Sequence, residues 1–232
     1  MSTLVTCKDL TKTYGKKPAL NRVNLEIESG HIIGLLGPNG SGKTTFIKLL
    51  NGLLTPTSGE LSVKNKPVGI ESKKVISYLP DQTYLNMNNK VKDVIDYFTA
   101  FYADFEPKRA YGMLESLQIS PEDRLKTMSK GTKEKVQLIL VMSRRAELYV
   151  LDEPIAGVDP AARDYILQTI LSNYDPEASI LVSTHLISDI ETILDQVIFI
   201  KEGEICLQAS VDDIRMQHQK SIDSLFREVF KC

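Results

Sequence analysis

A glycine-rich segment that contains one lysine separates two apolar runs in the first quarter of the chain. It reads Gly37-Pro38-Asn39-Gly40-Ser41-Gly42-Lys43-Thr44 and fits the P-loop pattern G-x-x-x-x-G-K-[ST]. Glycines let successive backbone N–H groups face one concavity, and the N-terminus of a following helix adds partial positive charge. We therefore expect polyphosphate binding by Gly37, Asn39, Gly40, Ser41, Gly42, Lys43, Thr44 and the adjacent Thr45. Lys43 would reach the β- and γ-phosphates, and the Thr44 hydroxyl would bind Mg²⁺.

Two adjacent carboxylates end a later apolar run, LYVLDEP. Asp152 is placed to hold Mg²⁺ directly or through water, which is the second requirement of a P-loop nucleotidase. Glu153 is placed to polarise a water for in-line attack on the γ-phosphate. The plain alternative is a strand that simply ends in solvent. Together with the P-loop, the pair predicts hydrolysis of a nucleoside triphosphate.

The elements that must position these residues are indicated by short apolar runs. The stretches IIGLL, LYVLDEP, ASILVSTH and QVIFIKEG read as buried strands of a mostly parallel sheet, because helix-like stretches separate them. Residues 44–54 have apolar side chains at helical spacing, and the alternation of Val23, Leu25 and Ile27 predicts β structure before the P-loop. The chain is therefore expected to be an α/β protein that begins with β structure.

Composition limits the classes of protein that this chain can belong to. Of its 232 residues, 42% are hydrophobic and 25% charged, and the formal net charge is −2. These values are typical of a folded globular protein with no global basic field, so we expect no nucleic-acid partner. The three cysteines are far apart and predict a reducing cytosol. With no leader and no long apolar run, work at a membrane would require another chain to cross it.

The motifs and their order resemble those of the ATP-binding cassette (ABC) ATPases, specifically the nucleotide-binding subunits of ABC transporters, over nearly the whole chain. Further matches are Tyr14 in KTYGKKPAL, Ser129 and Gly131 in TMSKGTKEKVQL, the D-loop-like Gly157-Val158-Asp159, and His185 in VSTH. The resemblance implies that Tyr14 stacks on adenine, that Asp159 meets an opposite subunit, and that His185 contacts the γ-phosphate. It also implies catalytic roles for Lys43, Glu153 and His185.

The stretch around Ser129 resembles the family's LSGGQ signature but departs from it at two positions. Ser129 is predicted to cap the helix that runs through KEKVQLILVM, and the positive end of this helix would receive a γ-phosphate bound on the other subunit. Lys130 replaces the first glycine and Thr132 replaces the usual glutamine. The sequence therefore predicts a functional signature in a head-to-tail dimer, with a plain capped helix as the alternative.

The Q-loop of the family maps onto YLPDQTYL, where two residues compete for the role. Asp81 occupies the position that often holds glutamine, and Gln82 follows it. Either side chain can approach Mg²⁺ and the attacking water, so both join Thr44 and Asp152 as candidate metal ligands.

An inserted helical subdomain is expected at about residues 84–146. One of its helices should bury a stripe formed by Val94, Ile95, Phe98, Phe101 and Tyr102. The resemblance places the aromatic stretch VIDYFTAFYADFEP where the subdomain meets a membrane partner.

The whole chain, residues 1–232, is thus expected to be one ABC nucleotide-binding domain with a mostly parallel central sheet, a small antiparallel β subdomain and the helical subdomain. It would bind ATP and Mg²⁺ and form a homodimer or heterodimer with a second cassette. It would drive a separate integral membrane permease from the cytoplasmic face of the membrane, with export favoured over import. The alternatives are a soluble ABC ATPase outside transport and a regulatory nucleotide-binding module with little turnover.

Overall fold

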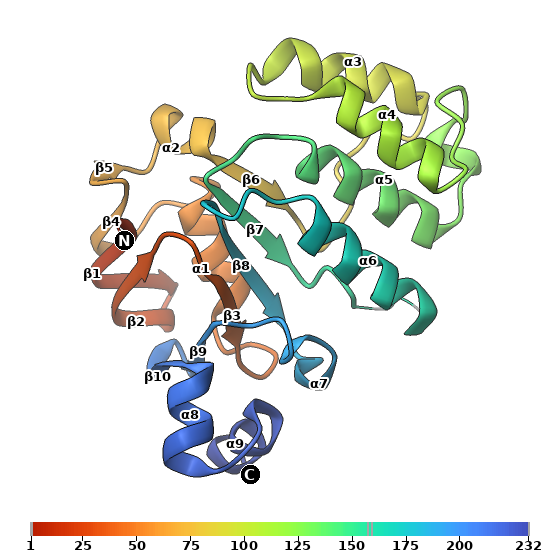
Figure 1. The fold of residues 1–232 in the computed structure, drawn as a ribbon. Helices are drawn as coiled ribbons and strands as arrows, with labels where there is room; N and C mark the ends of the chain where they lie inside the picture. The colour runs from red at the N-terminus through yellow and green to blue at the C-terminus, as the bar shows by residue number, and fades with distance from the viewer. Residues whose placement is uncertain (1, 157, 159, 232) are drawn as a thin grey trace.

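The computed structural model describes residues 2–156, 158 and 160–231, and a six-stranded sheet forms its centre (Figure 1). The strand order is β10-β9-β3-β8-β7-β6. The strands are β3 (Ile32–Leu36), β6 (Ile76–Leu79), β7 (Leu148–Asp152), β8 (Ser179–Thr184), β9 (Gln196–Lys201) and β10 (Glu204–Ser210). Neighbouring strands are parallel except for the β9–β10 pair. The predicted mostly parallel sheet is confirmed.

A smaller antiparallel sheet, with the order β2-β1-β4-β5, lies beside it. Its strands are β1 (Thr3–Tyr14), β2 (Lys17–Glu28), β4 (Ser58–Val63) and β5 (Lys66–Pro67). The helix α1 (Lys43–Leu50) contributes Phe46, Ile47, Leu49 and Leu50 to a hydrophobic core that this sheet shares with one face of the main sheet. This core holds α1 directly after β3, so the intervening loop is fixed at both ends.

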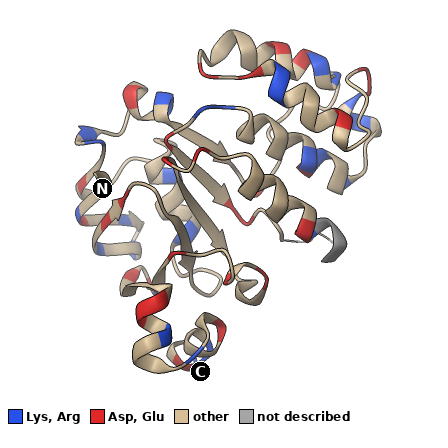
Figure 2. Ribbon diagram, in the orientation of Figure 1, with Lys and Arg blue, Asp and Glu red and all other residues tan. Residues whose placement is uncertain are grey.

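Eight further helices follow α1 among the described residues. The helices after α1 are α2 (Ile70–Val75), α3 (Val91–Phe101), α4 (Pro107–Ser116), α5 (Lys130–Met142), α6 (Pro160–Ser172), α7 (Ile187–Ile190), α8 (Val211–His218) and α9 (Ile222–Val229), with a 3₁₀ turn at Leu125–Thr127. The second core contains side chains from α3–α9. Helices α3, α4 and α5 pack on one another and lie together at the β6 side of the sheet (Figure 1). Basic and acidic residues are interspersed along the chain in this view (Figure 2).

The strand before the P-loop shows why its sequence is apolar throughout. Ile33 and Leu35 belong to the core that contains α1, whereas Ile32 and Leu36 belong to the core on the other face. At Gly34 a Cβ atom would lie 2.8 Å from Leu194 Cδ1, so this position needs a glycine or a shift of Leu194. A strand buried on both faces has no polar side to expose, which explains the continuous apolar run.

The predicted stripe on α3 is wrong at Phe101. Val94, Ile95 and Phe98 are buried as expected, but Phe101 is 69% exposed and stacks on the exposed Tyr97 with 4.9 Å between ring centroids. At about 100° of rotation per residue, Phe101 lies between the buried stripe and Tyr97 around the helix. The helix also ends there, because Tyr102 adopts an extended backbone. An apolar residue at the margin of a stripe is therefore left in solvent.

A buried arginine connects the helical region to the main sheet. The guanidinium of Arg144 donates to Ile76 O at 2.6 Å and to Lys74 O at 3.0 Å, and it pairs with Asp104 at 3.1 Å. It also lies 4.0 Å from the centroid of the Tyr102 ring. Because Asp104 and Tyr102 follow α3 while Ile76 begins β6, this one side chain fixes the end of α3 against the sheet.

Candidate functional site

The P-loop takes a conformation that only glycine can adopt at several positions. Gly40 and Gly42 have φ values of +80° and +117°. A Cβ at Gly42 would lie 2.6 Å from Ala19 O, and a Cβ at Gly37 would collide with Ile200 O. Glycine is therefore required at Gly37 and Gly42 because the loop packs against β9 and β2, in addition to any need for its backbone to approach a ligand closely.

The polar groups of this loop fit a polyphosphate. Helix α1 starts at Lys43 without a side-chain cap, so its first N–H groups keep their hydrogen-bonding capacity. Within the described part of the chain, the buried Ser41 Oγ has no hydrogen-bond partner. Thr44 is exposed and Thr45 half-buried in the first turn of α1, whereas Asn39 is exposed in the loop. An uncapped helix end beside an unpartnered hydroxyl is an anion site of the kind that phosphate occupies.

Lys43 is nearly buried beneath this loop. Its ammonium donates to Gly37 O at 2.7 Å and to Pro38 O at 3.2 Å. Burial lowers the pKa of Lys43, and the charges of Glu153 and Asp152 act in the opposite direction. The ammonium of Lys43 is therefore close enough to both carboxylates to interact with them electrostatically. Its present hydrogen-bond acceptors are two backbone carbonyls, which phosphate oxygens can replace.

Asp152 is the buried acid at the end of β7, with 1% of its surface exposed. Its Oδ1 accepts a 2.6 Å hydrogen bond from Ser183 Oγ, whereas its Oδ2 has no partner among the described residues. Burial raises the pKa of Asp152, as do the charges of Asp81 and Glu153, while Ser183 and Lys43 lower it. A buried carboxylate with one unpartnered oxygen is suited to a cation such as Mg²⁺, whose ligands are oxygens.

Glu153 follows in a strained backbone conformation, with φ at +52°. Its N–H donates to Ser183 O at 3.0 Å, and its Oε2 lies 3.0 Å from His185 Nδ1. Non-glycine residues in this region cost about 1–3 kcal/mol and are concentrated at functional sites. The strain motivates a functional hypothesis for Glu153, because β8 holds the backbone in this position and delivers His185 to the carboxylate.

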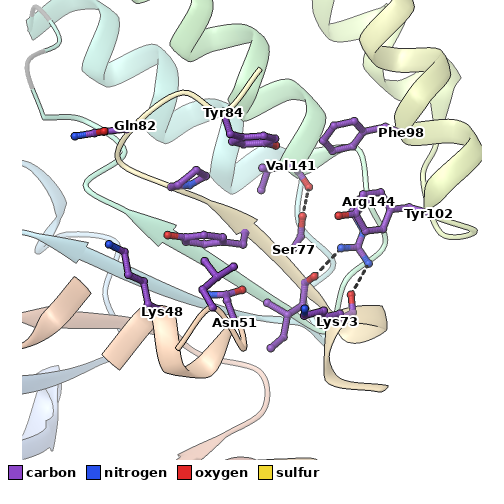
Figure 3. Close-up of a pocket in the computed structure, with 14 residues that line it drawn as sticks. Lys48, Asn51, Lys73, Ser77, Gln82, Tyr84, Phe98, Tyr102, Val141 and Arg144 are labelled. Carbon is purple, nitrogen blue, oxygen red and sulfur yellow. Dashed lines mark hydrogen bonds between the residues drawn. The ribbon is translucent and has the colours of Figure 1, made fainter. Parts of the chain in front are cut away.

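The two Q-loop candidates lie in different places. Asp81 lines a small cavity together with Asp152 and Glu153. Gln82 instead lines a groove of about 450 Å³ that we call the Arg144 groove (Figure 3). The groove is bordered by Lys48, Asn51, Leu53, Lys73, Ile76, Ser77, Tyr78, Pro80, Gln82, Tyr84, Phe98, Tyr102, Val141 and Arg144. Proximity to the carboxylates therefore favours Asp81 over Gln82 as a residue that reaches a bound metal.

The remaining predicted positions are not among the residues that line this cavity, or they fall outside the described residues. Tyr14 ends β1 with 52% of its surface exposed, and Lys12 Nζ lies 5.6 Å from its ring centroid. Ser129 caps α5 as expected, accepting from Thr132 N at 3.1 Å. Gly131 lies in the first turn of α5. Gly157 and Asp159 of the D-loop-like stretch fall outside the described residues.

The two departures from the signature have different structural consequences. Thr132 contributes to the cap, because its hydroxyl lies 2.8 Å from Ser129 Oγ as well. Lys130 has a largely exposed side chain whose ammonium lies 3.7 Å from Glu134, one turn further along α5. Neither replacement removes the helix cap on which the predicted phosphate contact depends.

The sequence analysis did not identify Ser183, which contacts both carboxylate-bearing residues. It is buried, hydrogen-bonds to Asp152 and accepts from the Glu153 backbone. A signal was present, because Ser183 is a hydroxyl near the end of the apolar run SILVST, two residues before His185. Parallel strands end at the same edge, so polar residues at neighbouring strand ends are expected to meet.

Comparison with known proteins agrees with this geometry. Residues 20–156 match the family model described as ABC transporter. The ABC-type transporter ATP-binding protein EcsA of Bacillus subtilis (strain 168) is 30% identical, with 98% of this chain and 97% of EcsA covered. The lantibiotic transport ATP-binding protein SrtF of Streptococcus pyogenes is 30% identical, with 88% of this chain and 90% of SrtF covered.

A solved structure of an ATP-binding subunit of an ABC transporter superposes with a TM-score of 0.89. It is 28% identical and covers 99% of this chain and 100% of the solved chain. No helix in the described ranges has both the length and the apolar character that a bilayer crossing requires. The chain therefore belongs to the ABC transporter family, as an ATP-binding subunit.

Proposed function

We propose that this chain hydrolyses ATP in the presence of Mg²⁺ and that dimer closure with a second cassette drives transport through a separate membrane permease. The observation that carries the proposal is the 3.0 Å pair of Glu153 and His185, which lies at the same sheet edge as Lys43 and Asp152. A base, an orienting group, a cation and a metal-binding acid at one edge are the parts that phosphoryl transfer to water requires.

The P-loop residues bind and orient the triphosphate in this proposal. The α1 N–H groups, Ser41 Oγ and Lys43 Nζ donate hydrogen bonds to phosphate oxygens, for which Lys43 exchanges its present bonds to Gly37 O and Pro38 O. Tyr14 stacks on the adenine. Thr44, Asp152 and Asp81 would hold Mg²⁺, which would supply positive charge to neutralise the phosphate oxygens.

Glu153 acts as the general base. His185 occupies Oε2, so Oε1 is the oxygen that accepts a proton from the attacking water. The backbone hydrogen bond from Glu153 to Ser183 O fixes the main chain of Glu153 beside β8, and the contact with His185 restrains its carboxylate. His185 thereby orients the base and presents its own imidazole toward the γ-phosphate side.

The exposed N-terminus of α5 is the proposed contact site for the second cassette. Ser129 and the first turn of α5 are exposed or half-buried, so the positive end of this helix is accessible to a partner. In a head-to-tail dimer this end meets the γ-phosphate bound on the partner chain. The pairing of Glu153 with His185 favours hydrolysis over a module with little turnover.

The Arg144 groove is the proposed docking site for the permease. Phe98, Tyr102 and Tyr84 supply aromatic surface, while Lys48 and Lys73 place positive charge at its border (Figure 3). A short apolar segment of the permease that carries an acidic residue fits this chemistry. The chain then lies at the cytoplasmic face of the membrane. We propose export rather than import as the direction, as expected from the sequence, whereas the name of SrtF specifies lantibiotic transport without a direction.

Purified chain tests the enzymatic part directly. We expect phosphate release from ATP that requires Mg²⁺ and is lost in Lys43→Ala. The exposed Lys48→Ala variant, one turn further along α1, is the matched control and should retain hydrolysis by the isolated chain. Absence of Mg²⁺-dependent hydrolysis in a folded wild type that binds ATP would favour the regulatory module. Loss of permease co-purification from membranes in Lys48→Glu would support the groove assignment.

A further inference from the structure

A cavity of about 40 Å³ lies between α5 and the residues that follow β6 and β7. Two of its polar lining side chains are almost completely buried, Gln137 at 3% and Asp152 at 1% exposure. Within the part of the chain that the structure describes, Gln137 Oε1 and Asp152 Oδ2 are both without a hydrogen-bond partner. Asp81, Glu153, Lys130 and Glu134 also contribute to its walls.

The chemistry of the two unpartnered atoms identifies what can satisfy them. An amide oxygen and a carboxylate oxygen are both acceptors, so they cannot bond to each other. A water donates two hydrogen bonds and can therefore satisfy both at once. One water needs about 10–15 Å³ of such space, so the cavity of about 40 Å³ has room for it.

We propose that Gln137 is a positioning residue for Asp152, acting through a water in this cavity that donates to Gln137 Oε1 and to Asp152 Oδ2. Ser183 of β8 already holds Oδ1 at 2.6 Å, so the carboxylate is restrained from two sides. The bridge also ties Asp152 to α5, the helix whose first turn Ser129 caps. The effect on Mg²⁺ rests on the proposed function, whereas the water bridge itself does not.

Thermal unfolding of Gln137→Met tests whether the Gln137 amide oxygen is hydrogen-bonded to a bridging water or has no partner at all. Methionine has a similar volume but accepts no strong hydrogen bond, so Asp152 loses its bridging partner. The control is Leu140→Met, a fully buried position on the same helix outside the cavity. We expect the midpoint of Gln137→Met to fall about 2–4 °C below that of the control. An equal or higher midpoint overturns the bridge, because removing an unsatisfied buried amide stabilises the fold.

The Mg²⁺ dependence of ATP hydrolysis tests the positioning role. Loss of a group that orients a metal ligand typically weakens metal affinity 10- to 100-fold. We expect Gln137→Met to need about tenfold more Mg²⁺ for half-maximal rate, with unchanged ATP affinity in EDTA and with Leu140→Met like wild type. An unchanged Mg²⁺ requirement overturns the role. Failure of wild type to hydrolyse ATP would instead remove the proposed function and leave the thermal comparison valid.

A high-resolution crystal structure of the wild type provides a test that needs no variant. The proposal predicts an ordered water within about 3.2 Å of both Gln137 Oε1 and Asp152 Oδ2. A metal ion at that position, identified by anomalous scattering after a Mn²⁺ soak, overturns the water bridge. A direct bond between the Gln137 amide nitrogen and Asp152 overturns it as well.

Discussion

The carboxyl edge of the main sheet and the helical region α3–α5 hold their polar groups in opposite ways. At the sheet edge, Lys43 and Asp152 are buried, and their positions follow from parallel strands that share two cores. In the helical region, Ser129 and Lys130 are exposed, and the one buried exception named here, Arg144, links the end of α3 to the sheet. The difference indicates that the proposed hydrolytic site is built on the packed core, while the proposed partner surfaces lie on exposed parts of the helices.

The largest expected effect is on the link between the two regions. Arg144→Ala would leave Asp104 without its partner and would remove the hydrogen bonds to Lys73 O, Lys74 O and Ile76 O, so the free energy of unfolding should fall by about 3–5 kcal/mol. Chemical denaturation measures this quantity. The neighbouring Arg145 is exposed and pairs with Glu106 at 2.7 Å, so Arg145→Ala is the matched control and should change stability little. Equal stabilities of the two variants would break the proposed contrast.

A second prediction concerns the sheet edge. Lys43→Ala removes the buried ammonium that faces both carboxylates, and the rate of ATP hydrolysis should fall more than about a hundredfold. ATP affinity, measured by calorimetric titration, should fall sharply as well, while Lys48→Ala should resemble wild type. Unchanged affinity and turnover in Lys43→Ala would exclude the P-loop from the site.

A third prediction addresses Tyr14, an exposed residue outside both regions. If its ring stacks on adenine, Tyr14→Ala should weaken ATP binding by about 1–3 kcal/mol, as base–aromatic stacking does elsewhere. Tyr14→Phe keeps the ring and should have a mild effect. Equal ATP affinity in Tyr14→Ala and wild type would leave this tyrosine with a packing role at the end of β1.

The smallest expected effect is on the stability of a variant at an exposed position of α3, compared with a buried position of the same helix. Phe101→Ala on the exposed side of α3 should change unfolding free energy by no more than about 0.5 kcal/mol. The buried Phe98→Ala should cost about 3–5 kcal/mol. A large loss of stability in Phe101→Ala would show that its stack on Tyr97 contributes to the fold, in which case this face would not be available to a partner.

The sequence was sufficient to predict those features whose structure is determined by neighbouring residues in the chain. The P-loop glycines, the runs that form β7, β8 and β9, and the Ser129 cap are local features, and each is present as predicted. Phe101 was misplaced because a helical stripe has no sharp margin in sequence. Asp81 and Gln82 were not separated, because adjacent residues after a strand point in different directions that only the fold defines.

The contacts that sequence could not reveal join segments distant in the chain. Ser183 reaches Asp152 from the next strand, and Arg144 reaches Ile76 across 68 residues. Gln137 lines the same cavity as Asp152 although it lies on a different element. Such polar contacts carry no periodic signal, since each depends on one side chain and on how the strands are ordered.

Trapping of a closed dimer tests the central claim most directly. Glu153→Gln keeps the size of the side chain but removes the base, so bound ATP should persist between two cassettes. Gel filtration with light scattering in Mg²⁺-ATP should then report about twice the 26.0 kDa of one chain, while wild type remains mainly monomeric. Adding Ser129→Arg should abolish the dimer by obstructing the α5 cap. A Glu153→Gln variant that turns over ATP normally, or stays monomeric at saturating ATP with and without its permease, would contradict the account.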